Sequence, residues 1–472
     1  MTRARALLQS VLPVAVLVSL PPAAGRPQGA PAPPLPVSVP AGVSAPAPRG
    51  RPLNVLLVVA DDLYWKIGAF GHPEVRTPNL ERLAARGRRF DAAYAQYPLC
   101  NPSRTSFLLG RRPERTRIWS NLDPPRAHLD GAVPLQEHFQ AQGYFTARLG
   151  KVYHGPFEKD FRWDLAEDAP DLPEEQIADD EAFEARILPS RRDDAGEPDG
   201  HSARRAVEVL EAHRGGPFFV AVGFVRPHGP WMAPQRYFDL YPPPSVKLPP
   251  LFPKDLDDVP RAALKRGAEP QILPSQRKAA LAAYYACVTF MDAQLGLLLD
   301  ALDRLSLWDD TVVVLLSDHG IQRGEHGLWR KNMLFEESAR VPLIVAAPQV
   351  AARGVPSDAL AELVDVYPTL VDLTGVPAPA GLDGVSLRPI LLDPRARVKE
   401  AAVTVSSRGL RLARSLRTSR WRYTWWRPDA AELYDHQQDP DEVHNLAADA
   451  RQRATVATLR QKLEQLAGGR LW

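Results

Sequence analysis

Residues 53–62 read LNVLLVVADD, an apolar stretch broken only by Asn54 that ends in two adjacent carboxylates. Polar residues do not alternate with the apolar ones, which is typical of a strand covered by helices on both faces of a parallel sheet. We therefore predict a buried strand over residues 53–60, with Asp61 and Asp62 at its carboxyl end.

Two further apolar runs end in polar residues. Residues 218–225 (FFVAVGFV) precede Arg226-Pro227-His228, and residues 311–317 (TVVVLLS) precede Asp318-His319-Gly320. Helical patterns occur at residues 78–87 with Thr77 as the N-cap, at 202–214 and at 275–305. This alternation predicts a doubly wound α/β domain, whose large and mostly parallel sheet lies between helices. Ligands of such sheets collect outside the carboxyl ends of the strands, so we expect the polar residues to share one site.

The pattern changes toward the C-terminus. Residues 415–426 (SLRTSRWRYTWW) alternate like a half-exposed antiparallel strand, and residues 432–435 (ELYD) resemble a short partner strand. Residues 450–466 form an amphipathic pattern typical of a closing helix. We predict two folded parts, a catalytic α/β domain over residues 52–394 and a smaller α+β subdomain over residues 395–472.

The N-terminal segment has the pattern of an export signal. Arg3 and Arg5 precede a mostly apolar run over residues 6–20, and small residues follow it. We predict a signal peptide over residues 1–24 and a Pro/Ala-rich disordered linker over residues 25–51. The alternative is an uncleaved membrane anchor, although the run is shorter than the ~20 residues of a spanning helix. We expect a periplasmic or secreted protein without stable membrane insertion.

The overall composition excludes several classes of protein. The chain has 472 residues, of which 45% are hydrophobic and 24% charged, as is usual for a globular protein. Lysine and arginine number 58 against 56 acidic residues, so no basic excess indicates nucleic acid as a partner. Two cysteines exclude a disulfide-stapled small fold and a cysteine-rich zinc module.

One cysteine lies in a recognisable motif. Residues 100–104 (CNPSR) match the C-x-P-S-R signature of type I sulfatases, and residues 106–113 continue that family's pattern except at Leu109, where many members have Thr. The resemblance covers roughly residues 52–446 and implies an alkaline-phosphatase-like sulfatase fold. It also implies that a formylglycine-generating enzyme converts Cys100 to formylglycine (3-oxoalanine), whose hydrate is the nucleophile. A buried free thiol is the alternative for Cys100 and our interpretation of Cys287.

Carboxylates at the strand ends indicate a metal site. Asp61, Asp62 and Asp318 are suited to a hard cation such as Ca²⁺. The resemblance implies that one Ca²⁺ binds Asp61, Asp62, residue 100, Asp318 and His319. Histidine at the last position is found in the iduronate-2-sulfatase branch, whereas many other members have Asn. The alternative for the aspartate pair is a helix N-cap after the strand.

The resemblance also implies a set of catalytic residues: Cys100, Arg104, Lys151, His154, His228 and Lys331. Arg104 is expected to pair with the hydrate and the metal ligands, and Lys151 to bind sulfate. One hydroxyl of the hydrate would attack sulfur while Lys331 and His228 stabilise or protonate the leaving oxygen. The other hydroxyl would then lose its proton to His154 and expel sulfate. We expect a structural role for His326 in the turn at residues 324–327.

The resemblance also points to a substrate class. We predict a sulfuric ester hydrolase that acts on a sulfated sugar, such as the sulfated uronic acid of a glycosaminoglycan. Two alternatives remain, a phosphonate or phosphate ester hydrolase on the same scaffold and an inactive relative that only binds sulfated glycans. Four arginines could face a polyanionic saccharide or be solvated surface residues: Arg111, Arg112, Arg115 and Arg117.

Overall fold

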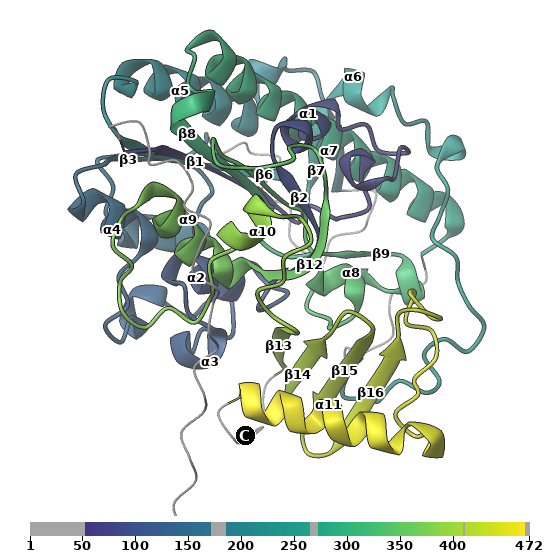
Figure 1. Cartoon of the computed structure of the whole chain (residues 1–472). Coiled ribbons are helices and arrows are strands. Elements are labelled where there is room, and N and C mark those ends of the chain that lie inside the picture. Colours follow the sequence, from purple (N-terminus) through teal and green to yellow (C-terminus); the bar gives the residue numbers. More distant parts are fainter. Residues whose placement is uncertain (1–51, 171–185, 265–271, 409–410, 468–472) are drawn as a thin grey trace, which may run out of the picture. The chain divides into compact units, whose positions relative to one another are not determined.

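The computed structural model describes residues 52–170, 186–264, 272–408 and 411–467. The predicted signal peptide and linker lie outside these residues. Eight strands form the main sheet in the order β12-β2-β11-β8-β1-β6-β3-β4 (Figure 1). All neighbouring strands are parallel except β11, which is antiparallel to both β8 and β2. The strands are β1 Asn54–Asp61, β2 Arg88–Tyr94, β3 Phe145–Gly150, β4 Leu165–Glu167, β6 Phe218–Pro227, β8 Thr311–Ser317, β11 Leu343–Ala346 and β12 Ser357–Glu362.

Helices cover both faces of this sheet, which explains why β1 is apolar throughout. Leu56 and Val58 belong to one core cluster, whereas Val55 and Leu57 belong to another. On the first face lie α1 Pro78–Arg86, α5 Pro198–His213, α6 Gln235–Phe238 and α7 Pro274–Arg304. On the second face lie α2 Cys100–Leu109, α4 Leu135–Ala141, α9 Val366–Thr374 and α10 Arg388–Leu392. The predicted α/β architecture is confirmed.

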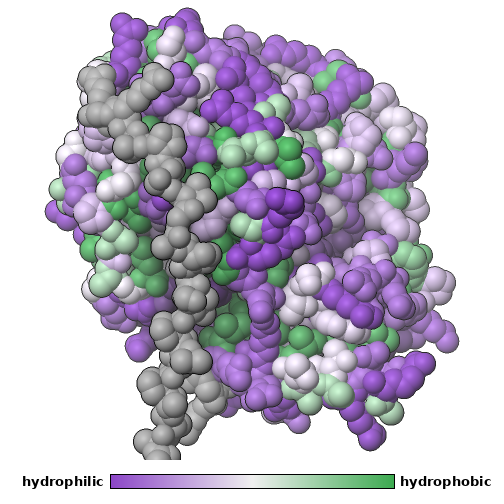
Figure 2. All heavy atoms as spheres, in the orientation of Figure 1, coloured by the Kyte–Doolittle hydropathy of each residue, from purple (hydrophilic) through white to green (hydrophobic). Residues whose placement is uncertain are grey.

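The helix α7 is the longest element of the described chain. By length and composition it is the one helix in the described ranges that could cross a membrane, but 83% of its apolar window is buried inside the protein. Its apolar residues therefore form core. Hydrophilic side chains cover most of the face drawn in Figure 2, where hydrophobic ones form small separate groups.

Thr77 is the N-cap residue of α1, as predicted, but its side chain does not cap the helix. Its Oγ1 makes no capping hydrogen bond and accepts the Ala69 amide at 2.9 Å instead. The carboxylate of Asp292, on α7, accepts the backbone amides of Asn79 and Leu80 at 3.0 and 2.8 Å. Tertiary packing thus supplies the acceptor that the free amides of this helix need.

The C-terminal residues form a separate antiparallel sheet in the order β13-β14-β15-β16, which the helix α11 contacts (Figure 1). Its elements are β13 Ala402–Arg408, β14 Arg411–Arg417, β15 Trp421–Trp426, β16 Ala430–Asp435 and α11 Arg453–Leu466. The prediction of one strand over residues 415–426 is wrong, because a hairpin turn at Thr418 divides it. The Thr418 amide donates to the Trp421 carbonyl at 2.8 Å, and the alternating pattern continues through this turn.

The remaining strands and α-helices are short. They are the strand pairs β5 Ile187–Ser190 with β7 Trp231–Pro234 and β9 Gln322–Arg323 with β10 Trp329–Arg330, and the helices α3 Pro113–Thr116 and α8 Glu336–Ala339. Several 3-10 turns, such as Gly68–Phe70, connect the elements.

The carboxyl ends of the central strands lie side by side. Ala60 on β1 pairs with Ser317 on β8, and Asp61 pairs with Pro227 on β6. On the other side of β6, Gly150 at the end of β3 pairs with Gly223. The residues that follow these strands are therefore brought to one edge of the sheet.

Candidate active site

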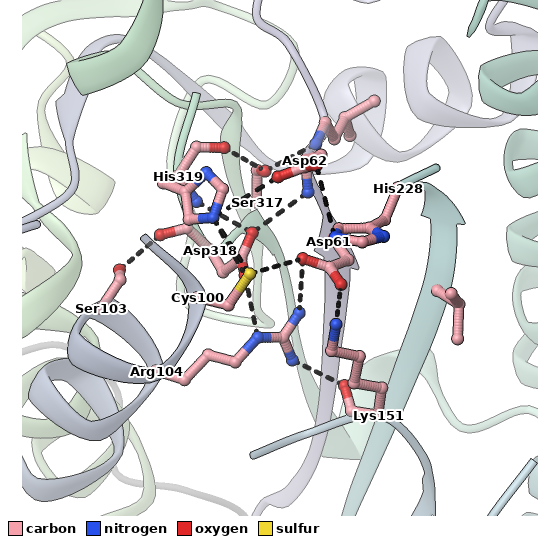
Figure 3. Close-up of polar contacts among 12 residues, drawn as sticks. Asp61, Asp62, Cys100, Ser103, Arg104, Lys151, His228, Ser317, Asp318 and His319 are labelled. Carbon is pink, nitrogen blue, oxygen red and sulfur yellow. Dashed lines mark hydrogen bonds and ion pairs between the residues drawn. The ribbon is translucent and has the colours of Figure 1, made fainter. Parts of the chain in front are cut away.

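Side chains from six segments meet at this edge, and Figure 3 shows those from β1, β3, β6, β8 and α2. Asp61 ends β1 and Asp62 follows it, Asp318 and His319 follow β8, and Lys151, His154 and His228 follow β3 and β6. Cys100 and Arg104 lie on the first turns of α2, and Lys331 follows β10. The sequence predicted all of these residues, and the fold brings them together.

Cys100 lies at the centre of the group and is fully buried. Its Sγ is 3.5 Å from Asp61 Oδ1, 3.4 Å from His319 Nε2 and 3.1 Å from Lys331 Nζ. Burial, followed by the charge of Asp61, raises the pKa of the Cys100 thiol to about 12. The thiol is therefore protonated at neutral pH, and it is not a ready thiolate nucleophile.

The two adjacent aspartates are held by lysines. Lys151 Nζ contacts Asp61 Oδ2, and Lys331 Nζ lies 2.8 Å from Asp62 Oδ1. Burial alone would raise the pKa of both carboxyls, but the surrounding positive charges, led by Lys151 for Asp61 and by Lys331 for Asp62, together outweigh it and lower both pKa values. The next helical turn begins only at Gly68, so the alternative of a helix N-cap pair is wrong.

Asp318 joins the aspartates to Arg104. Its Oδ2 accepts Arg104 Nε at 2.8 Å, and its Oδ1 accepts the amides of Asp62 and His319 at 3.2 and 3.0 Å. Arg104 Nη1 donates to the carbonyls of Lys151 and Val152 at 2.7 and 3.0 Å. Arg104 thereby connects the ends of β8 and β3 from a fully buried position.

Three histidines line the same site. His319 Nδ1 faces the Gly320 carbonyl at 2.9 Å, so it carries the proton, and Nε2 faces Cys100. His228 Nε2 is 3.9 Å from Asp62 Oδ2, and burial, followed by the charge of Lys331, lowers its pKa. Burial and the charge of Lys151 lower the pKa of His154 to about 3, so this imidazole is neutral near pH ~7.

Four of the predicted ligands fit a divalent cation. One ligand atom each from Asp61, Asp62, Cys100 and His319 lies within 4.8 Å of the others, and all four residues are buried. Two carboxylates, and an oxygen at position 100 after oxidation, are the donors that a hard cation prefers. Asp318 is not part of this group, and both of its carboxylate oxygens accept hydrogen bonds, from Arg104 and from backbone amides.

Two residues of the site were missed by sequence reasoning. Ser317 Oγ accepts the Leu63 amide at 2.9 Å, and Tyr284, on α7, donates its hydroxyl to the Asp62 carbonyl at 2.7 Å. The position of Ser317 next to Asp318 was a usable signal. No local pattern around Tyr284, which lies inside an apolar helix, indicated its contact.

Three of the four arginines near Cys100 have structural partners. Arg112 forms a two-pronged ion pair with Glu362 at 2.8 and 2.6 Å, and Arg115 pairs with Asp383. Arg111 Nη1 donates to the carbonyls at 129 and 130. These contacts tie the three guanidinium groups to the protein itself, a third placement beside the two expected ones of a saccharide-facing or a solvated residue.

His326 also has a structural partner. Its Nδ1 lies 3.0 Å from Asp255 Oδ1, and its ring stacks on Phe335 with centroids 4.2 Å apart. This placement agrees with the expected supporting role.

Comparisons with known proteins support the same interpretation. The sulfatase family model matches residues 53–376, and the model of the N-sulphoglucosamine sulphohydrolase C-terminal region matches residues 324–468. A sulfatase of Formosa agariphila is 31% identical over 87% of this chain and 86% of its own length. Human iduronate 2-sulfatase is 32% identical over 69% of this chain and 70% of its own.

Solved structures share the fold. The phosphonate monoester hydrolase of Agrobacterium radiobacter has a TM-score of 0.76 at 22% identity, covering 89% of this chain and 96% of its own. A protein in complex with its substrate D-glucosamine-2-N,6-O-disulfate has a TM-score of 0.74 at 22% identity, covering 89% and 98%. Together with the family match over most of the chain, the arrangement around Cys100 leads to one conclusion: this chain belongs to the sulfatase family and is a sulfuric ester hydrolase with an alkaline-phosphatase-like fold.

Proposed function

We propose that this sulfatase removes sulfate from a sulfated sugar, with residue 100 as formylglycine and one Ca²⁺ in the site. The observation that carries the proposal is the position of Cys100, whose Sγ lies within 3.5 Å of an aspartate, a histidine and a lysine at once. A sulfate ester presents negatively charged oxygens to a nucleophile, so a site that hydrolyses it needs fixed positive charge.

Two proposed groups, Ca²⁺ and formylglycine at position 100, would complete the chemistry of the site. Bound Ca²⁺ would polarise the sulfate oxygens, and the hydrate of formylglycine would offer one hydroxyl as the nucleophile and a second for regenerating the aldehyde. Asp61, Asp62, residue 100 and His319 would hold the cation, with Asp318 as the fifth proposed ligand. Because Asp318 already accepts from Arg104, any ligand bond from it would have to share that carboxylate.

The cations of the chain bind and orient the substrate. Burial opposes the charge of Lys151 and Lys331, but for both groups nearby carboxylates outweigh it and raise the pKa, so both are ammonium ions at neutral pH. Lys151 and Lys331 approach the site from different strands and would hold the sulfate oxygens. Arg104 would hold residue 100 and Asp318 in position relative to each other.

Proton transfer falls to two histidines and a lysine. Lys331 and His228 would stabilise or protonate the leaving oxygen. His154 is neutral at neutral pH and its Nδ1 has no hydrogen-bond partner among the described residues, so it is free to accept a proton in the second half of the reaction.

The proposed substrate class comes from the relatives. One relative is an iduronate 2-sulfatase, another is named an ulvan-active sulfatase, and the second structural neighbour was solved with a sulfated glucosamine. A sulfated uronic acid or another sulfated sugar of a glycosaminoglycan fits this range. We further propose that the protein is exported and not inserted in a membrane, that a formylglycine-generating enzyme matures it, and that nucleic acid is no partner.

One experiment tests both halves of the proposal. Mass spectrometry of the peptide that contains residue 100 should show the loss of sulfur and the gain of an aldehyde. The same preparation should release sulfate from members of a panel of sulfated disaccharides, and chelation should abolish the release. An unmodified Cys100 in a fully active enzyme would contradict the mechanism.

A phosphonate or phosphate ester hydrolase is the second candidate. Its support is the fold shared with phosphonate monoester hydrolases and the 26% identity to a multifunctional alkaline phosphatase superfamily protein of Trinickia caryophylli. The cations of the site could also serve a phosphate dianion. Rates on matched sulfate and phosphate esters would separate the two candidates, and binding of sulfated glycan without any turnover by aldehyde-containing protein would favour a purely binding role.

A further inference from the structure

Asp62 has an unusual backbone conformation for a residue at the end of a strand. Its φ is 63°, in the left-handed region that residues other than glycine seldom adopt. In an extended strand, consecutive side chains point to opposite faces. Asp61 and Asp62 nevertheless both offer a carboxylate oxygen to the same group of possible ligands. The turn at Asp62 is what allows two adjacent side chains to face one site.

Three side chains hold this turn by hydrogen bonds to its backbone. Asp318 Oδ1 accepts the Asp62 amide, and Ser317 Oγ accepts the Leu63 amide at 2.9 Å. Ser317 ends β8 and Asp318 follows it. The third is Tyr284, which reaches the turn from α7 on the first face of the sheet.

The Tyr284 hydroxyl joins two points of the turn. It donates to the Asp62 carbonyl at 2.7 Å and accepts the Tyr64 amide at 2.8 Å. The side chain is 1% exposed, so water cannot easily replace it. The guanidinium carbon of Arg323 lies 4.5 Å from the centroid of its ring, which restricts where the ring can move.

We propose that Tyr284 is a positioning residue for the metal site: its hydroxyl fixes the left-handed turn at Asp62 and thereby directs the Asp62 carboxylate into the ligand group. The proposal rests on the proposed function, in which a divalent cation occupies that group. Tyr284 itself touches neither the cation nor the substrate.

Removal of the hydroxyl should weaken metal binding more than folding. In Tyr284→Phe, the ring and its packing stay, but the Asp62 carbonyl and the Tyr64 amide both lose their partner. The turn can then relax toward an extended conformation, which moves the Asp62 carboxylate. Loss of an outer hydrogen bond that orients a ligand typically weakens metal binding by about 10- to 100-fold.

The test is calcium titration of metal-free protein by isothermal calorimetry, with the melting temperature of each metal-free variant measured alongside. Tyr285→Phe is the matched control. Tyr285 is the next residue of the same helix and is half-buried, its ring also lies near Arg323 at 5.6 Å, and its hydroxyl has no hydrogen bond within the described ranges. We expect a Kd for Ca²⁺ about 10- to 100-fold higher in Tyr284→Phe and unchanged in Tyr285→Phe.

The outcomes separate this inference from the proposed function. Absence of calcium binding by the wild-type protein would overturn the proposed metal site and the role of Tyr284 with it. Equal Kd values in the wild type and Tyr284→Phe would overturn the role of Tyr284 alone. Metal-free Tyr284→Phe that does not fold, or an equal loss of affinity in Tyr285→Phe, would also overturn it, because the effect would then be one of general stability.

Discussion

Two buried clusters of charged residues in this protein contain similar side chains but differ in how completely their carboxylate oxygens are paired. The active-site cluster comprises Asp61, Asp62, Cys100, Lys151, Lys331 and His319. The Arg422 cluster comprises Glu336, Arg417, Arg422, His436 and Glu442, and joins α8 to the C-terminal sheet. Each contains at least three groups close enough together to bind a metal ion.

In the Arg422 cluster, every carboxylate oxygen has a hydrogen bond. Arg422 bridges Glu336 and Glu442, and the other oxygens accept Tyr94 Oη at 2.9 Å and the Glu336 amide at 2.7 Å. The Arg422 side chain is 1% exposed. Because each carboxylate oxygen of this enclosed network is already paired, none is left to bind a ligand. The network serves to join two parts of the fold.

In the active-site cluster, the contacts are looser and partly open to solvent. Asp61 Oδ1 has only long contacts, at 3.5 Å to Cys100 Sγ and to Arg104 Nη2, and Asp62 Oδ2 is 3.9 Å from His228. Lys151 and Lys331 are 18% and 17% exposed. Both clusters contain side chains that can bind a metal ion, so the presence of such side chains is a weak sign of function. Incompletely paired carboxylates beside lysines that are open to solvent are a stronger sign.

The largest expected effect separates the two cysteines. Both thiols are buried, with pKa values raised to about 12, chiefly by burial. Cys100→Ala should lower the rate of sulfate release by about 10⁴-fold or more, because the nucleophile is lost. Cys287→Ala, which removes a buried core sulfur and its contact at 3.6 Å to the Met232 carbonyl, should retain turnover. Comparable activity in both variants would contradict the assignment of residue 100.

The next effect concerns stability in the Arg422 cluster. Arg422→Met should lower the free energy of unfolding by about 3–5 kcal/mol, because Glu336 and Glu442 are left buried without their shared partner. Urea unfolding monitored by circular dichroism measures it. Lys331→Met should cost clearly less stability, since its cluster is partly open to water, while abolishing most activity. Equal losses of stability would remove the distinction drawn between the clusters.

The next prediction concerns the pH dependence of stability at the ion pair of His326 with Asp255, which lies outside both clusters. Burial would lower the pKa of His326, but the bond to Asp255 and the charges of nearby carboxylates together outweigh it and raise the pKa to about 9. Because the pKa of His326 is higher in the folded than in the unfolded state, protonated His326 stabilises the fold fully at pH values below its unfolded pKa. This contribution should decline as the pH rises from ~6.5 to ~9. The decline should be on the order of 3 kcal/mol. Unfolding free energies of the wild type and His326→Gln across this range measure it, and the variant should show a flatter profile.

The smallest expected effect decides which cluster binds calcium. Free Ca²⁺ at about 100 times its Kd should stabilise the wild type by about 2.7 kcal/mol. Thermal unfolding with and without the cation detects this gain. Asp62→Asn should lose the response, and His436→Gln should keep it. The reverse result would place the cation in the Arg422 cluster and contradict the comparison.

Local patterns predicted most of the fold and of the site. The apolar strands over residues 53–60 and 311–317 are read directly from composition, because burial on both faces demands unbroken apolar runs. The motif at residues 100–104 and the polar residues after each strand identified the group around Cys100, since parallel strands bring their carboxyl ends to one edge. The hairpin at Thr418 escaped this reasoning because alternation continues across the turn.

The sequence by itself determined the strand ends, the cysteine motif and the family, because each depends on residues that are neighbours along the chain. Tertiary structure alone decided the acceptor at the start of α1, the pairing of Arg112 with Glu362 and the support of Asp62 by Tyr284, 222 residues away. Buried polar groups must find partners wherever packing places them, and no local pattern records which distant side chain will arrive there.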